Sequence, residues 1–111
     1  MVSTEIFRLL ALSFPGTEEM PHFERTSFRV NKKIFATLDV KSGIACLMLT
    51  EVDQSVFSSY DKSIIYPVPN KWGKQGATFV VLKKVPKAML KDAMTQAYNK
   101  LTTKKPGKKK T

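Results

Sequence analysis

Apolar and polar residues alternate along residues 26–38, and this pattern predicts a β-hairpin. The apolar positions are Phe28 and Val30 in the first strand, and Ile34, Ala36 and Leu38 in the second. Successive side chains of a strand point to opposite faces, so a period of two is typical of paired strands. Residues 30–33 form the predicted turn, because Asn31 tolerates the positive φ that tight turns require. This stretch predicts strands at the centre of a sheet and does not indicate a function.

Shorter runs predict the rest of the sheet. The uninterrupted apolar run at 44–49 suits a central strand covered on both faces. Residues 77–82 are rich in β-branched and aromatic side chains, which favour strands. We expect further extended segments at 18–23 and at 64–66, where the following proline disfavours helix. The sequence therefore predicts a mainly antiparallel sheet of about five strands.

Apolar residues recur three or four positions apart in three other segments, which predicts three helices beginning near Thr4, Thr50 and Pro86. Asp53 follows Thr50 by three residues, as in a capping box, and Pro86 suits a first helical turn. The apolar positions of the second helix are Val52, Val56, Phe57 and Tyr60. The predicted fold class is α+β, an antiparallel sheet of about five strands flanked by three helices.

The length of 111 residues and an apolar content of 42% suit one domain with its own core. We expect this domain to span residues 1–103. Residues 104–111 hold five lysines and no apolar residue, which predicts a disordered tail.

The net charge is +10, and it is unevenly placed. Residues 1–55 contain six basic and seven acidic side chains, whereas residues 56–103 contain eight and two. A basic C-terminal half favours nucleic acid or another polyanion as a partner, although solubility alone also explains it.

Several kinds of site are not expected. With Cys46 as the single cysteine the chain cannot form an internal disulfide, and a reducing cytoplasm is the simplest location. A protein metal site needs three or four ligands, and the chain offers one histidine and one cysteine, so neither a metal nor another cofactor is expected. No segment approaches the ~18 apolar residues of a membrane span, so no membrane contact is expected.

Catalytic residues are not evident either. His22 beside Glu18 and Glu19 could form a proton-transfer pair, but a structural, hydrogen-bonded histidine is the favoured interpretation. Adjacent residues of an extended chain point opposite ways, which argues against Glu18 and Glu19 as a paired acid and base. Cys46 lies inside an apolar run and is predicted to be a small buried hydrophobe. We therefore expect no enzymatic activity.

A series of segments spread over the chain resembles a known family. The segments are 14–19, 21–23, 27–30, 33–38 and 67–76, followed by the C-terminal helix. In this order and spacing they resemble the MmcQ/YjbR-like proteins over residues 5–102. The resemblance implies a double-wing fold, with hairpins as wings on a helix-flanked antiparallel sheet, and it implies DNA binding. One position departs from the family pattern: the family often carries an aromatic residue where this chain has Ala77.

Six residues are candidate nucleic-acid contacts at hairpin and loop tips. They are Arg29, Lys32, Lys33, Lys71, Lys74 and Gln75. The cations would contact phosphates and Gln75 a base edge, while the glycines of 71–76 would let backbone approach backbone closely. In the alternative interpretation these are solvated turn residues. For Trp72 we favour a structural role, as a lid on the core.

The expected function is non-catalytic DNA binding, largely through electrostatic contacts to phosphates. It requires residues 29–33 and 71–74 to lie on one face, and the cluster of Lys83, Lys84, Lys87 and Lys91 could join them. The alternative is a protein-interaction or regulatory domain that binds an acidic partner or adds an extended peptide to a sheet edge. A monomer is expected in either case.

Overall fold

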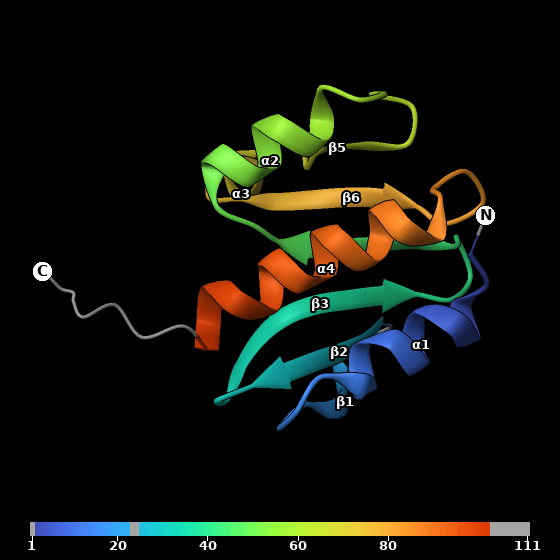
Figure 1. The fold of residues 1–111 in the computed structure, drawn as a ribbon, viewed down its shortest axis with the longest axis vertical. Coiled ribbons are helices and arrows are strands. Elements are labelled where there is room, and N and C mark those ends of the chain that lie inside the picture. The colour runs from blue at the N-terminus through green and yellow to red at the C-terminus, as the bar shows by residue number, and fades with distance from the viewer. Residues whose placement is uncertain (1, 23–24, 103–111) are drawn as a thin grey trace, which may run out of the picture.

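A computed structural model of the chain describes residues 2–22 and 25–102, so the lysine-rich segment 104–111 lies outside the described residues. The described residues form four helices and six strands (Figure 1). The helices are α1 (Thr4–Ser13), α2 (Glu51–Ser58), α3 (Lys71–Lys74) and α4 (Lys87–Thr102). The strands are β1 (Glu18–His22), β2 (Arg25–Val30), β3 (Lys33–Asp39), β4 (Ile44–Met48), β5 (Ile65–Pro67) and β6 (Ala77–Val81).

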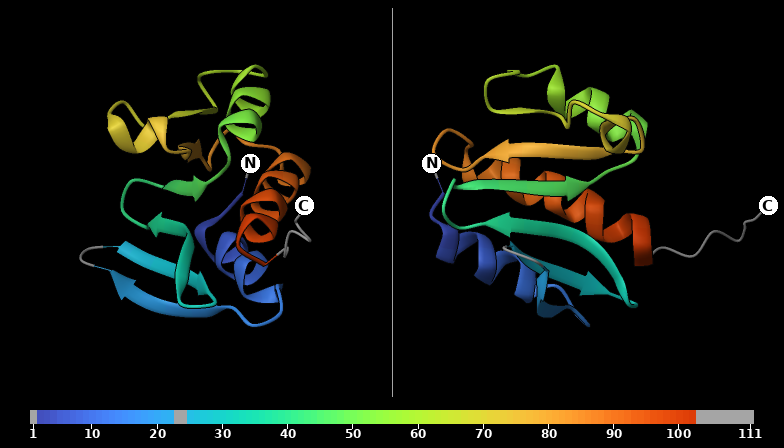
Figure 2. Two further views of the ribbon diagram at one scale, coloured as in Figure 1. Left: turned by 90° about the vertical axis from the view of Figure 1, so that its left-hand side faces the viewer. Right: turned by 180° about the vertical axis from the view of Figure 1, so that it is seen from behind.

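All six strands form one antiparallel sheet in the order β1-β2-β3-β4-β6-β5. Helices α1 and α4 lie on one face of this sheet, and the opposite face carries no such layer (Figures 1 and 2). The predicted α+β class is confirmed. The predicted count of three helices was too low, because the fourth helix is a single turn inside a stretch predicted as a loop. Each of the six strands falls on a segment predicted to be extended, so the sheet has one strand more than the predicted total of about five.

The hairpin predicted at 26–38 is formed by β2 and β3. Its two turn residues, Asn31 and Lys32, both have positive φ, at 53° and 67°, as a tight two-residue hairpin turn requires. Farther along the ladder, Phe28 pairs with Ala36 but Arg29 pairs with Ile34, so Phe35 is the extra residue of a β-bulge. The bulge lets Phe35 and Ala36 both be buried although they are adjacent in the strand.

The core lies between the sheet and its two covering helices. Alternate residues of β4, Ala45 and Leu47, contribute to it, and α4 contributes a stripe at helical spacing. The buried residues of α4 are Leu90, Ala93, Met94 and Ala97. The Phe7 ring of α1 meets the Phe28 ring of β2 edge to face at 5.8 Å, which fixes α1 against the sheet.

Helix α2 begins as predicted, but of its four predicted apolar positions only Phe57 packs against the core. The backbone N–H of Asp53 donates to the Thr50 hydroxyl at 3.1 Å, which confirms Thr50 as the helix cap. Val52, Val56 and Tyr60, however, are 72%, 52% and 67% exposed. The residues that α2 buries are Gln54 and Ser58.

Within the described residues the Ser58 hydroxyl is buried without a hydrogen-bond partner. We expect the Ser58→Ala substitution to raise the free energy of unfolding by about 1 kcal/mol, because an unpaired buried hydroxyl is destabilising and alanine favours helix. Urea denaturation measures the change. Ser59→Ala is the control, since that exposed hydroxyl donates to the Val56 carbonyl at 2.7 Å. A loss of stability in Ser58→Ala alone would contradict the prediction.

Candidate functional site

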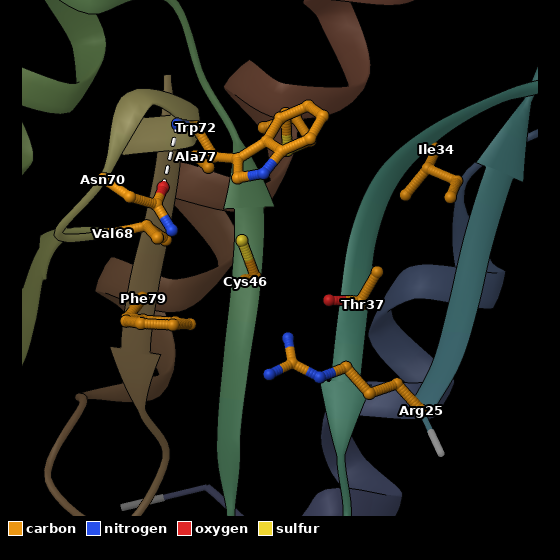
Figure 3. Close-up of a pocket in the computed structure, with 10 residues that line it drawn as sticks. Arg25, Ile34, Thr37, Cys46, Val68, Asn70, Trp72, Ala77 and Phe79 are labelled. Carbon is orange, nitrogen blue, oxygen red and sulfur yellow. Dashed lines mark hydrogen bonds between the residues drawn. The ribbon is translucent and has the colours of Figure 1, made fainter. Parts of the chain in front are cut away.

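The uncovered face of the sheet contains a hollow with a volume of about 620 Å³. Its floor is formed by β3, β4 and β6, one end by β2, and the other end by the segment that leads into α3 (Figure 3). Most of its lining is apolar. The lining residues are Arg25, Ile34, Thr37, Cys46, Met48, Val68, Asn70, Trp72, Ala77 and Phe79.

Trp72 reaches this hollow from α3. Asn70 caps that helical turn, because its side-chain oxygen accepts from the backbone N–H of Trp72 at 2.8 Å. The indole is directed over the end of β4 (Figure 3), and Trp72 is 58% exposed. The predictions of a loop here and of Trp72 as a lid on the core are therefore wrong. Trp72 borders the hollow on the uncovered face and is far from buried.

Two glycines fix the place of α3. A Cβ added to Gly73 would lie 1.8 Å from the carbonyl oxygen of Val68, and one added to Gly76 would lie 1.8 Å from that of Leu49. Gly76 also has φ of +108°, and its carbonyl accepts from the Leu49 N–H at 2.9 Å. The expected close approach of backbone to backbone at these glycines is confirmed, and it holds Trp72 in position.

The Gln54 side chain ties α2 to the same segment. Its buried amide nitrogen lies 2.8 Å from the Gly73 carbonyl, 3.0 Å from that of Ala77 and 3.2 Å from the Thr78 hydroxyl. Thr78 in turn donates to the Gly76 carbonyl at 2.9 Å. Gln54 is a second donor to both carbonyls, because Gly73 also accepts from the Gly76 N–H and Ala77 from the Val68 N–H, each at 3.0 Å. The amide is thereby paired although it is buried.

Arg25 forms the end of the hollow opposite Trp72. The guanidinium points from β2 across β3 toward Cys46 (Figure 3). Arg29 lies four residues farther along the same strand and is partly buried, with its Nε donating to the Ser27 hydroxyl at 3.2 Å. Arg29 was a predicted contact residue, whereas Arg25 was not. The alternation of arginine at 25 and 29 on one strand face was the signal that could have found it.

Acidic residues on β1 divide between the two faces. Glu19 accepts from Arg8 of α1 at 2.9 Å on the covered face. Its neighbour Glu18 is paired with Arg29 in the strand register. The expectation that Glu18 and Glu19 point opposite ways is confirmed, so they form no carboxylate pair.

Cys46 lies on the floor of the hollow and is partly buried. Burial raises the pKa of its thiol, which therefore stays protonated at neutral pH. No group of three or more His, Cys, Asp or Glu side chains among the described residues could hold a metal ion.

The six predicted contact residues are placed in three locations. Lys71 and Lys74 border a second hollow of about 560 Å³, which lies between α2 and the segment 67–70. Gln75 follows them and is exposed. Lys32 and Lys33 are exposed at the β2–β3 turn, which the Asn31 amide ties to the Leu101 carbonyl of α4 at 3.3 Å. Arg29 lies on the uncovered face.

The two basic tips share one end of the sheet without being adjacent. Because β3, β4 and β6 are antiparallel neighbours, the start of β3 and the start of β6 lie at the same end, with β4 between them (Figure 1). Lys83 and Lys84 follow the other end of β6. The predicted convergence of that cluster with the two tips is therefore not found.

The fold and its exposed face define a class: two-layer α+β domains in which helices cover one side of an antiparallel sheet. The YjbR family profile matches residues 12–100, and the chain belongs to the YjbR family.

A solved structure has the same fold. The crystal structure of Deinococcus radiodurans protein DR2400, a DUF419 domain, is similar with a TM-score of 0.79 and 20% sequence identity. The alignment covers 94% of this chain and 81% of that one. No curated protein matches the sequence.

Among the described residues, no helix has the length and apolar character needed to cross a membrane.

Proposed function

We propose that this protein is a non-catalytic nucleic-acid-binding domain, with DNA as the favoured partner. The observation that supports this most is the uncovered sheet face, where Arg25 and the exposed Trp72 border one hollow and Arg29 lies on the same strand as Arg25. Lys71 and Lys74 add positive charge on α3, and Lys32 and Lys33 add it at the β2–β3 turn. Cations at such positions attract phosphates and release their counterions.

The face is not uniformly basic. Glu18 is paired with Arg29 in the register, and Asp39 lies at the far end of β3. A polyanion would therefore run along the end of the sheet that holds the two basic tips, where lysines dominate. Contacts of this kind carry no sequence information, so the proposed binding is mainly electrostatic.

The test removes two charges at each end of the sheet in turn. The Lys71→Ala/Lys74→Ala pair should weaken duplex DNA binding and lower the slope of log affinity against log salt by about 2, or about 1 for each lost phosphate contact. The control pair Lys83→Ala/Lys84→Ala has the same net charge and should leave the slope nearly unchanged. Fluorescence anisotropy with labelled DNA over a salt series measures both. If the two double variants lose DNA affinity equally, the binding is not confined to the end of the sheet that holds Lys71 and Lys74.

The tail needs its own control, because five lysines attract DNA without any fold. A truncation ending at residue 103 should still bind at low salt. If it does not bind, the folded domain is not a DNA-binding surface.

The apolar lining of the hollow favours a second candidate function, the binding of an acidic or extended peptide. Val68 directly follows β5, a sheet edge, so a peptide could lie beside that edge with side chains in the hollow, paired through residues other than Pro67, which has no N–H. A peptide that displaces DNA from the domain would favour this candidate.

A further inference from the structure

The hollow on the uncovered face has a planar group at each end. The Trp72 indole lies at one end and the Arg25 guanidinium at the other, with Cys46 between them (Figure 3). The floor between these groups is made of apolar side chains, including Ile34, Met48 and Phe79. A volume of about 620 Å³ falls within the roughly 300–1,000 Å³ typical of small-ligand pockets. The hollow is therefore large enough for a flat aromatic ligand group.

We propose that this hollow accepts an unpaired base of a single-stranded nucleic acid, which stacks on Trp72 while Arg25 contacts the flanking phosphate. The inference rests on the proposed function and specifies its ligand. A base has an apolar π-face and a polar edge, and the hollow offers an aromatic ring, an apolar floor and few polar groups. The adjacent chain of phosphates matches the positive charge of Arg25 at one end of the hollow and of Lys71 and Lys74 on α3 at the other.

The exposure of Trp72 is the strongest part of this argument. A tryptophan usually buries most of its large apolar surface, but here 58% remains exposed. The capping bond from Asn70 and the two close glycine contacts hold the turn that carries the indole in place. Because the backbone of this turn is already fixed, only the two side-chain torsions of Trp72 remain to be ordered when a base stacks on it, which keeps the entropic cost of binding small.

Only an unstacked, unpaired base could enter the hollow. In a duplex both π-faces of a base are covered by its neighbours, and the backbone forms the outer surface. To reach the floor of the hollow the base would have to be unstacked and unpaired, which costs a few kcal/mol in duplex and much less in a single strand. The domain should therefore prefer single strands, in which bases are already accessible.

Two side chains could contact the polar edge of the base. The side-chain oxygen of Asn70 accepts from the backbone N–H of Trp72, which leaves the side-chain NH2 group of Asn70 as a donor. The Thr37 hydroxyl lines the hollow near Arg25 (Figure 3). Neither group is specific for one base or for the sugar, so the shared ligand chemistry is an unpaired base with its phosphates, from DNA or from RNA.

The test uses Trp72 as its own reporter, because it is the single tryptophan of the chain. Full-length protein is titrated with an oligothymidylate, the matching oligouridylate, an abasic DNA strand of equal length and a fully paired duplex. Stacking predicts strong quenching of the tryptophan fluorescence by the first strand, the second or both. The abasic strand and the duplex should quench weakly. Comparison of the first two strands distinguishes DNA from RNA.

Variants then test the contact itself by anisotropy with labelled strands. Trp72→Ala should weaken single-strand binding about 5- to 150-fold, the equivalent of ~1–3 kcal/mol per stacked base, and Trp72→Phe should retain part of the affinity. Tyr60→Ala is the matched control, because Tyr60 is an aromatic residue of similar exposure away from the hollow. It should bind like the unchanged protein.

Three results would overturn the inference. If the abasic strand binds as tightly as oligothymidylate, no base enters the hollow, although the proposed nucleic-acid binding still stands. If no strand or duplex binds at low salt, the proposed function fails as well. If an acidic peptide such as oligoglutamate quenches Trp72 and displaces the strand, the hollow is a protein-binding site.

Discussion

The Gly76→Ala substitution should lower the free energy of unfolding by about 4 kcal/mol or more, which is a large share of the ~5–15 kcal/mol typical of a domain. The new methyl carbon would lie 1.8 Å from the Leu49 carbonyl oxygen, and this neighbour is backbone that cannot rotate away. The hydrogen bond from the Leu49 N–H to the Gly76 carbonyl would break as the strands separate. Urea denaturation followed by circular dichroism measures the loss.

Gly43→Ala is the matched control for backbone conformation. Gly43 also has positive φ, at +70°, but an added Cβ there meets no atom within 4 Å. That substitution should cost only the strain of the left-handed conformation, about 1 kcal/mol. The difference between the two variants isolates the steric clash. Equal losses would mean that the contact between Gly76 and Leu49 is looser than the structure describes.

The Gln54→Glu substitution should destabilise the protein by about 3–5 kcal/mol at neutral pH, because it leaves a buried, uncompensated charge. The change keeps the shape of the side chain but replaces the amide donor with a carboxylate. That carboxylate would face the carbonyls of Gly73 and Ala77. Repulsion and burial would raise the pKa of the new carboxyl in the folded state above its unfolded value.

The sign of the pH dependence follows from that raised pKa. The penalty is fully present above the folded-state pKa and shrinks as the pH falls toward the unfolded pKa of about 4.3, where the protonated group can again donate. Gln54→Met removes the donor without adding a charge and should show the pH dependence of the unchanged protein. Denaturation midpoints at several pH values measure both. A stability difference between Gln54→Glu and the unchanged protein that does not vary with pH would contradict the prediction.

Local pattern was enough to predict most of the fold. The alternation at 26–38 and the runs at 44–49 and 77–82 correspond to β2, β3, β4 and β6, and the Thr50 cap is where the sequence places it. Such features depend on neighbours within a few residues. The fourth helix was missed because a single turn of four residues, two of them Trp72 and Gly73, has no apolar period to detect.

The candidate site was harder to predict, because its parts meet only in three dimensions. Helical spacing predicted α2 but did not show that Gln54 is the residue it buries. That burial depends on carbonyls 19 and 23 residues away. Arg25 and Trp72 lie 47 positions apart in the sequence and border one hollow because β2 and α3 lie on either side of the three strands that form its floor. A spacing argument cannot supply that arrangement.

The two outermost strands of the sheet have a common feature with a consequence for solubility. Both β1 and β5 contain a proline, Pro21 and Pro67, and proline has no N–H to offer a further strand. An open sheet otherwise grows from its edges into dimers or fibrils. Prolines at both edges therefore disfavour the fusion of sheets between two copies of this domain, even at high concentration.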